Sequence, residues 1–263
     1  MISTSGKIRA DILLVERGLA ASRAKAQALL LAGQVWSGTE RIEKAGQLLA
    51  SDAPLRLAQQ ERFVSRGGYK LEGALKALEL DVRGLVCVDV GASTGGFCDC
   101  LLQSGAAKVY AVDVGENQLD ARLRSDARVV VMDRTNARYL EPTHFAEPLE
   151  LAVVDASFIG IEKLLPALAR ILPSGARLLA LIKPQFEAGR REATRARGVI
   201  RDAALRNELI ERARAQVAEQ GFDVLGGVDS VLAGPKGNLE YFVLARRSSG
   251  SALDAHSTIT HKS

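Results

Sequence analysis

The sequence of 263 residues contains very little histidine, which limits the chemistry it can perform. His144, His256 and His261 are the only histidines, and the last two lie in the C-terminal stretch SSGSALDAHSTITHKS. A catalytic site built on histidine is therefore not expected. If the protein is an enzyme, its general base should be Lys, Asp, Glu or Tyr.

Cysteine and long apolar segments are also scarce. Cys87, Cys98 and Cys100 form no Cys-x-x-Cys pair and cannot all be bridged, so we expect no disulfide framework and no zinc or other metal site. They should be small, buried hydrophobic side chains. No apolar run approaches the roughly 20 residues that cross a bilayer, and the N-terminus lacks the apolar core of a secretory signal. We expect a cytoplasmic protein with no membrane partner.

The remaining composition is that of an ordinary globular protein, with 47% hydrophobic and 25% charged residues. The length suits one large domain or two modest ones, and disorder, collagen and coiled coil are excluded for the chain as a whole. Lys and Arg number 35 against 31 Asp and Glu, a formal charge of +4. This balance leans slightly toward a polyanionic partner.

The segment from Arg9 to about Leu57 reads as a small unit of two helices followed by short strands around VWSG and APLRLA. Ser22 is a natural N-cap of the second helix, and Gly33 is a natural stop. Helical spacing predicts that four apolar residues of this helix face a core: Ala24, Ala28, Leu29 and Ala32. The edge then left to solvent carries Arg23, Lys25 and Gln27.

The pattern RADILLVERGLAASRAKAQALLLAGQVWSG resembles the S4 RNA-binding domain, in which two packed helices and a hairpin present Arg and Lys to RNA. The resemblance implies RNA contacts at Arg9, Arg23 and Lys25. Residues 1–64 hold nine basic against six acidic residues, a local charge of +3. The chain departs from the family at VWSG, where a second Val and an Asn usually precede the Gly. The alternative is a helical hairpin with a solvated charged face, and basic residues alone give affinity without selecting a sequence.

After the connector QQERFVSRGGYK, apolar strands alternate with helices to about residue 247. Continuous apolar strands such as VCVDVG and ARLLALIKP favour a parallel sheet buried under helices on both faces, a doubly wound α/β domain. The last two strands follow a single helix and are joined by LAGPKGN. They should form an antiparallel hairpin at the edge of the sheet.

A glycine-rich loop directly follows the first of these strands. Its backbone can approach a ligand closely, and the free amides at the start of the next helix favour an electronegative group. The spacing is not the GxGxxG of dinucleotide sites, and no Gly-Lys-Ser/Thr is present for a nucleoside triphosphate. Asp113 ends the second strand, where a carboxylate can accept from two ribose hydroxyls, and Asp133 ends the third, level with the expected adenine.

These three features in register resemble the class I S-adenosylmethionine (SAM) methyltransferases, whose fold is Rossmann-like. The resemblance implies SAM as the cofactor and a set of residues that contact it. This set comprises Gly91, Ala92, Ser93, Thr94, Gly95, Gly96, Phe97, Asp113, Val114, Asp133, Arg134 and Asp155.

Four residues in separate motifs form a candidate catalytic group: Lys70, Asp155, Lys183 and Glu240. Asp155 and Lys183 follow consecutive strands, and open α/β sheets place their sites at the carboxyl ends of strands. Methylation of a ribose 2′-hydroxyl requires a weak acid to lose its proton as it attacks a sulfonium methyl group. A lysine crowded by a second lysine and partly desolvated can accept that proton, while carboxylates orient it.

The order Lys, Asp, Lys, Glu resembles the tetrad of FtsJ-like RNA 2′-O-methyltransferases. With VSRGGYKLEGAL, DVGASTGGFCDCLL, DRTNAR, VVDASFI, IKPQFE and GNLEYF in order, the chain resembles the TlyA family, also labelled haemolysin A, from about Ile8 to Arg246. Gly67-Gly68-Tyr69 stands where the family usually has a Gly-Ala-His-like triplet. The resemblance implies rRNA (cytidine-2′-O)-methyltransferase activity on ribosomal subunits, with Lys183 as the base.

The resulting domain prediction is an S4-like RNA-binding domain at 8–60, a connector at 61–67, an FtsJ-like methyltransferase domain at 68–247 and a disordered tail at 248–263. Further RNA contacts are expected in the second domain at Arg66, Phe158, Arg190 and Arg191. The last two begin a stretch, residues 190–214, with eight Arg against four acidic residues. A solvated helix face is the other interpretation of that stretch.

Other functions receive less support from the sequence. A membrane-active haemolysin is not supported, because the sequence has no membrane-spanning segment. An RNA-binding assembly factor with a vestigial methyltransferase fold is not supported either, because the glycine loop and the tetrad are intact. A pseudouridine synthase would need an Arg-Leu-Asp motif that is absent. The sequence leaves open the oligomeric state, the cytidine that is modified, and whether one or both ribosomal subunits serve.

Overall fold

The computed structural model describes residues 6–58, 61–157, 159–188 and 199–249. The chain divides into two units, Met1–Arg62 and Phe63–Ser263. This boundary falls inside the segment expected to be a connector, 61–67. Phe63 is already buried in the second unit, the backbone N–H of Val64 donates to Asp99, and helix α3 begins at Arg66, so the residues from Phe63 onward are not a linker.

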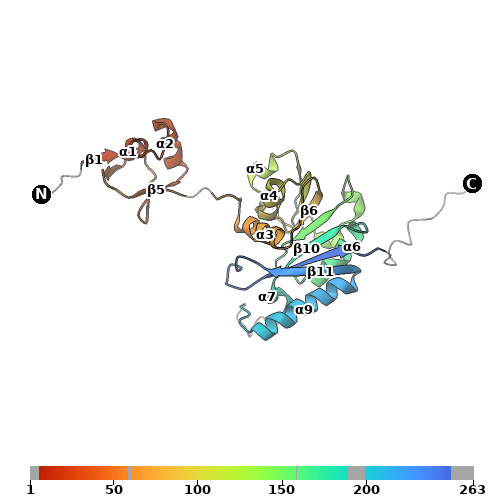
Figure 1. Ribbon diagram of the computed structural model, residues 1–263. Coiled ribbons are helices and arrows are strands. Elements are labelled where there is room, and N and C mark those ends of the chain that lie inside the picture. The colour runs from red at the N-terminus through yellow and green to blue at the C-terminus, as the bar shows by residue number, and fades with distance from the viewer. Residues whose placement is uncertain (1–5, 59–60, 158, 189–198, 250–263) are drawn as a thin grey trace, which may run out of the picture. The chain divides into compact units, whose positions relative to one another are not determined.

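The first unit combines two helices with two small antiparallel sheets (Figure 1). The helices are α1 (Ala10–Glu16) and α2 (Arg23–Leu31). One sheet pairs β1 (Lys7–Arg9) with β4 (Leu48–Ala50), and the other has the order β3 (Glu40–Arg41), β2 (Val35–Ser37), β5 (Leu55–Leu57). Their common core consists of Ala10, Leu14, Ala20, Ala26, Leu30, Val35 and Ile42.

Helix α2 has the predicted ends but a different buried face. The Ser22 hydroxyl accepts from the backbone N–H of Lys25 at 3.2 Å, and Gly33 has a φ of +65°, so both predicted boundaries are confirmed. The core-facing residues are Ala26 and Leu30, with Leu29 partly buried. The prediction for the other three apolar positions was wrong, because the residues exposed to solvent include Ala24, Ala28 and Ala32.

A buried carboxylate explains this orientation of α2. Asp11 is fully buried in α1 and accepts hydrogen bonds from Arg9 at 3.0 and 3.1 Å, from Arg23 at 2.8 Å and from Gln27 at 3.0 Å. The guanidinium of Arg9, and then that of Arg23, hold the pKa of Asp11 well below its usual value against the effect of burial. Because Arg23 and Gln27 must face Asp11, the next residues along that face, Ala26 and Leu30, turn toward the core.

The second unit is built on a seven-stranded sheet with the order β11-β12-β10-β9-β6-β7-β8. The strands in chain order are β6 (Val86–Val90), β7 (Lys108–Val112), β8 (Val129–Met132), β9 (Leu151–Val154), β10 (Arg177–Ile182), β11 (Phe222–Asp229) and β12 (Tyr241–Arg247). All neighbours are parallel except β12, which is antiparallel to both β10 and β11. This confirms the predicted doubly wound sheet and its antiparallel edge hairpin.

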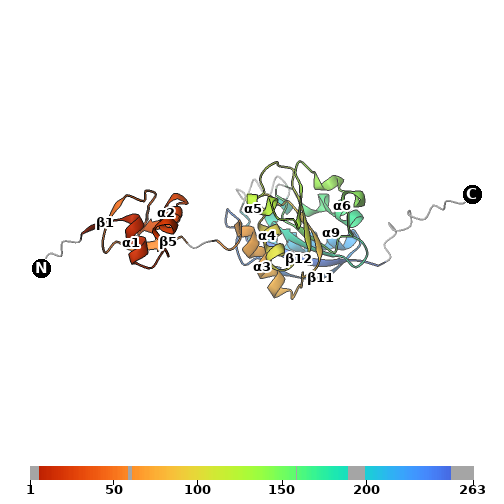
Figure 2. The same cartoon turned by 90° about the horizontal axis from the view of Figure 1, so that it is seen from above.

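Helices cover both faces of this sheet (Figure 2). They are α3 (Arg66–Ala77), α4 (Gly96–Gln103), α5 (Ala121–Arg124), α6 (Leu165–Ile171), α7 (Pro184–Glu187) and α9 (Ala203–Glu219), with single 3-10 turns at Ala137–Tyr139, Pro142–His144 and Ile161–Lys163. Side chains of α3, α4 and α5 form one core with the sheet, and those of α6 and α9 form the other. Cys87, Cys98 and Cys100 are buried in the first core, as predicted. No helix within the described ranges is long and apolar enough to cross a membrane.

Asp89 places a carboxyl group inside the sheet, on the side facing α4. It is completely buried, and its Oδ2 accepts from the backbone N–H of Cys98 at 2.9 Å in the first turn of α4. Among the described residues, Oδ1 has no hydrogen-bond partner. Exclusion from water, assisted by the nearby charge of Asp155, raises the pKa of Asp89 to about 8. The group is therefore neutral near pH 7. Its hydrogen bond with Cys98 connects the end of β6 to the start of α4.

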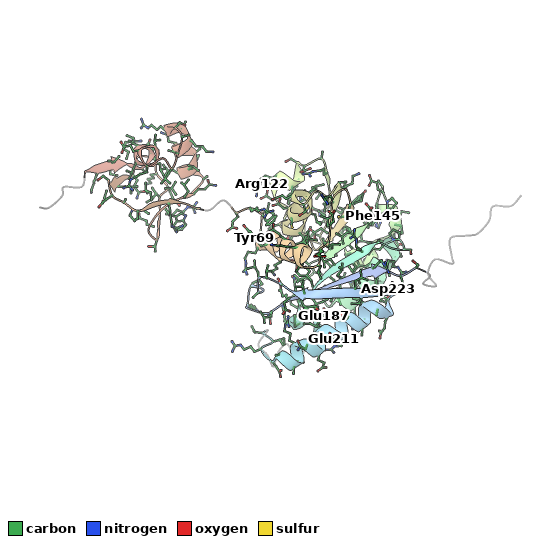
Figure 3. All side chains as sticks on the ribbon, viewed as in Figure 1. Tyr69, Arg122, Phe145, Glu187, Glu211 and Asp223 are labelled. Carbon is green, nitrogen blue, oxygen red and sulfur yellow. The ribbon has the colours of Figure 1, made fainter. Side chains whose placement is uncertain are left out.

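We expect the folded protein to lose stability as the pH rises from about 4 to about 8, because in that window the native state keeps a proton on Asp89 that the unfolded chain has released. Asp89→Asn cannot titrate. It should gain stability relative to the wild type as the pH rises, measured by urea unfolding at pH 5, 7 and 9. An identical pH dependence in both proteins would contradict this assignment. Asp223→Asn, at an exposed position on β11 (Figure 3), is the matched control.

Candidate active site

A cavity of about 390 Å³ opens where the carboxyl ends of the central strands meet helix α3. Its walls come from α3, from the glycine loop after β6, from the ends of β9 and β10, and from the loop before β12. The lining residues are Ser65, Arg66, Gly67, Lys70, Gly91, Ala92, Ser93, Thr94, Gly96, Phe97, Asp155, Ser157, Lys183, Pro235 and Glu240. All four residues of the predicted tetrad are among them.

The first pair in this cavity joins α3 to the start of β12. Nζ of Lys70 donates to Oε2 of Glu240 at 2.5 Å, and these side chains are only 8% and 1% exposed. Glu240 directly precedes β12, and Lys70 lies in the second turn of α3. A charge-assisted bond of this length offsets part of the cost of removing both groups from water.

The second pair joins the ends of two parallel strands. Nζ of Lys183 lies 2.6 Å from Oδ1 of Asp155 and donates to the hydroxyl of Ser157 at 2.9 Å. Asp155 directly follows β9 and Lys183 directly follows β10; these strands are neighbours, so their ends lie at one edge. Pro184 begins α7 immediately after Lys183, which ends the strand at that point. Ser157 was missed by sequence reasoning, although it stands in the same DAS motif as Asp155.

A second cavity, of about 350 Å³, adjoins the first and shares four residues with it: Gly91, Ser93, Asp155 and Ser157. Asp113 and Val114 also line it. The two oxygens of Asp113 accept from the backbone N–H groups of Ser93 at 2.8 Å and Gly115 at 2.7 Å. This carboxylate therefore holds the glycine loop in place while facing the cavity.

Gly91 is required by close packing at the boundary of the two cavities. Its φ is +87°, and a Cβ there would lie 2.9 Å from the backbone oxygen of Asp155. Gly95 has a φ of +96° at the N-cap of α4 but does not line either cavity. The loop thus turns so that its backbone, without side chains, faces the space between β6 and β9.

The acid at the end of the third strand, which was expected level with the adenine, makes contacts with other side chains and backbone groups. Asp133 lines neither cavity; its Oδ2 lies 2.5 Å from the guanidinium of Arg124 and accepts from the backbone N–H of Asn117. Arg134 also lines neither cavity and pairs with Glu116. The lining polar side chains in this region, which sequence reasoning missed, are Gln118, Thr135 and Asn136.

Glu187 is a half-buried acid next to the tetrad. It extends from α7 (Figure 3), and its Oε1 accepts from the backbone N–H of Ile161 at 3.0 Å. With Lys183 it lines a space of about 10 Å³, which is close to the size of one water molecule. Burial raises the pKa of Glu187 to about 7. Nothing in the KPQFE motif indicates that this acid is half-buried.

The residues expected to contact RNA are found in three situations. Arg66 lines the first cavity and donates to the backbone oxygen of Ala233 at 2.9 Å. Arg9 and Arg23 are bound to Asp11, whereas Lys25 is exposed. The other three lie outside the described residues: Phe158, Arg190 and Arg191. Within the described residues, no group of three or more His, Cys, Asp or Glu could hold a metal ion.

A family model described as FtsJ-like methyltransferase matches residues 63–247. The chain belongs to the FtsJ-like methyltransferase family. This methyltransferase is 42% identical, over 95% of its chain and 93% of the relative, to a Mycobacterium tuberculosis protein named 16S/23S rRNA (cytidine-2'-O)-methyltransferase TlyA. It is 40% identical, over 89% of its chain and 98% of the relative, to Hemolysin A of Brachyspira hyodysenteriae. The resemblance to the TlyA family is thereby confirmed.

Solved structures agree with this placement. A hemolysin-labelled protein from Streptococcus thermophilus has a TM-score of 0.70 and 40% identity, and the match covers 93% of this methyltransferase and 90% of that chain. A SAM-dependent methyltransferase from Listeria monocytogenes has a TM-score of 0.53 and 13% identity. The match covers 70% of this chain and 99% of the Listeria chain. At that identity the likeness shows the shared fold alone.

We expect Lys70→Met to destabilise this methyltransferase by about 3–5 kcal/mol, because it leaves the buried carboxylate of Glu240 without its partner. The double variant Lys70→Met/Glu240→Gln removes both charges and should lose less. Urea unfolding of the full chain measures both. Arg83→Met breaks the exposed pair with Asp81 and serves as the control that should change little. A Lys70→Met protein as stable as the wild type would show that the pair does not stabilise the fold.

Proposed function

We propose that this methyltransferase transfers a methyl group from SAM to the ribose 2′-hydroxyl of a cytidine in ribosomal RNA. The observation that carries the proposal is Lys183, which is nearly excluded from solvent and held by Asp155 and Ser157 where the two cavities adjoin. The activity in the name of the 42% identical TlyA relative supports the reaction and the substrate class.

The second cavity fits the cofactor. Its volume of about 350 Å³ is within the range of small-molecule sites, and it combines apolar walls with the Asp113 carboxylate. The Gly91 backbone lets a ligand approach where any side chain would collide with the chain. When bound there, SAM supplies an electrophilic methyl group on a sulfonium. Asp113 would accept from the ribose hydroxyls, while Gln118 and Asn136 offer further polar contacts.

The first cavity would receive the target ribose. Nζ of Lys183 would take the proton from the 2′-hydroxyl of a bound ribose, and Asp155 and Ser157 hold that nitrogen in position. The ribose oxygen would take the methyl group, and S-adenosylhomocysteine would leave. Lys70, held by Glu240, adds a positive charge to the same cavity and stabilises the charge that develops on the ribose oxygen.

The first unit would hold the ribosomal subunit through an S4-type surface, with Arg9, Arg23 and Lys25 near RNA phosphates. Its local charge of +3 supports a polyanionic partner. Work on ribosomal subunits would take place in the cytoplasm. The name Hemolysin A belongs to a relative, and dye leakage from liposomes distinguishes a membrane-active function from methylation.

The decisive test is methyl transfer from labelled SAM to purified small and large ribosomal subunits that lack the modification. We expect label as 2′-O-methylcytidine, identified by mass spectrometry, with the wild type, and loss of about 100-fold or more in rate with Lys183→Ala, because the general base is removed. SAM binding by calorimetry should be retained in the variant. Unchanged turnover would remove Lys183 from the base role.

A wild-type protein that binds SAM but labels neither subunit would contradict the substrate assignment. Leakage of dye from liposomes, in place of methylation, would favour the membrane-active alternative. Failure to bind SAM at millimolar concentration would instead favour an assembly factor with a vestigial methyltransferase fold.

Asp113→Ala should weaken SAM binding by about 10- to 100-fold, because charge-assisted hydrogen bonds to two hydroxyls are lost together with the support of Ser93 and Gly115. Asp133→Ala is the matched control, since this carboxylate lies outside both cavities. Calorimetric titration with SAM measures both variants. A larger loss in Asp133→Ala than in Asp113→Ala would reverse the assignment of the two acids.

A further inference from the structure

A row of three large side chains crosses the three-stranded sheet of the first unit. Trp36, at the centre of β2, is opposite Arg41 of β3 on one side and opposite Arg56 of β5 on the other. Because directly opposed residues point to the same face of an antiparallel sheet, the three side chains share one face. We call this row the Arg–Trp–Arg row.

The other face of the sheet packs against the core, so the Arg–Trp–Arg row faces away from it. Val35 is fully buried, and its partner Leu57 packs against the same cluster. Arg41 and Arg56 are exposed, and Trp36 is half-buried. The only tryptophan of the chain therefore contributes its ring to a surface.

Charge and ring are combined in this row. The guanidinium of Arg56 lies 5.2 Å from the centroid of the indole, a cation–π contact that fixes the ring against the sheet. Nε of Arg41 lies 3.6 Å from Oε1 of Glu43. Both side chains are exposed, so this ion pair contributes little stability. The Arg–Trp–Arg row thus presents an ordered aromatic surface between two cations.

We infer that the Arg–Trp–Arg row binds an unpaired nucleotide of RNA, with a base stacked on the Trp36 indole and the flanking phosphates held by Arg41 and Arg56. Unpaired bases in loops and bulges are recognised by stacking on aromatic and guanidinium planes, whereas paired bases are not accessible for it. Two positive charges on either side of an aromatic ring suit a ligand with a phosphate backbone better than they suit an apolar peptide. The choice of RNA as partner rests on the proposed function.

Because Trp36 is the only tryptophan, its fluorescence reports on this surface directly. The full chain is titrated with a single-stranded oligocytidine of about 12 nucleotides and with an RNA duplex of the same length. We expect the single strand to quench the fluorescence and the duplex to quench it much less. Equal quenching by both, or none by either, would overturn the inference.

Variants then test whether the contact contributes to affinity. Trp36→Ala should weaken binding of the single strand by about tenfold or more, and Trp36→Phe, which keeps an aromatic ring, should recover part of it. Arg56→Gln should weaken binding more than Lys76→Gln, a control that removes one exposed positive charge from the second unit. Circular dichroism and SAM calorimetry confirm that each variant is folded. Wild-type affinity in Trp36→Ala and Arg56→Gln would overturn the inference.

Ribosomal subunits separate this inference from the proposed function. If the wild type methylates subunits and Trp36→Ala does so with unchanged KM, the Arg–Trp–Arg row fails while the function stands. If neither methylates but the single strand still quenches Trp36, the proposed function fails while the row stands. If Trp36→Ala loses affinity for intact subunits but not for the isolated RNA, the row binds ribosomal protein, which overturns the inference.

Discussion

Removing an ammonium group from water costs several kcal/mol, and both Lys70 and Lys183 are almost fully excluded from solvent. A carboxylate lies within 2.6 Å of each Nζ and offsets part of that cost. Glu240 is 170 residues from Lys70, so the pair forms only when α3 and the β12 edge are both in place. The completed sheet is thus a condition for the site, and the site in turn fixes the two ends of the methyltransferase unit to each other.

The sheet was predictable because its strands are continuous apolar runs, and the convergence of Asp155 with Lys183 was predictable because ends of parallel neighbours meet at one edge. Features that depend on contacts between particular side chains were not predictable from the sequence. The buried face of α2 depends on Asp11, which the sequence presents as an ordinary acidic residue at a helix start. Likewise, only the folded structure shows that Arg124 forms an ion pair with Asp133. The spacing of apolar residues in the sequence predicts which positions are buried. It does not predict which polar side chains form hydrogen bonds or ion pairs with each other.

The two adjoining cavities explain why the glycine loop and the tetrad belong to one site. Strands β6 and β9 are parallel neighbours, so the loop after β6 and the residues after β9 meet, with only the width of Gly91 between them. A side chain at Gly91 would separate the space lined by Asp113 from the space lined by Lys183. A donor in one cavity and an acceptor in the other can therefore meet without a large movement of the chain.

The charge of the first unit is only mildly positive, and two of its arginines are held by an acid of the same unit. A sequence count gives it +3, with Asp11 among the six acidic residues counted, and Arg9 and Arg23 share the buried carboxylate of that residue. A net charge of this kind attracts phosphate but selects no sequence. Discrimination must come from contacts with bases. In this unit the one tryptophan, placed beside Arg56 on an outward sheet face, has the chemistry to make such a contact.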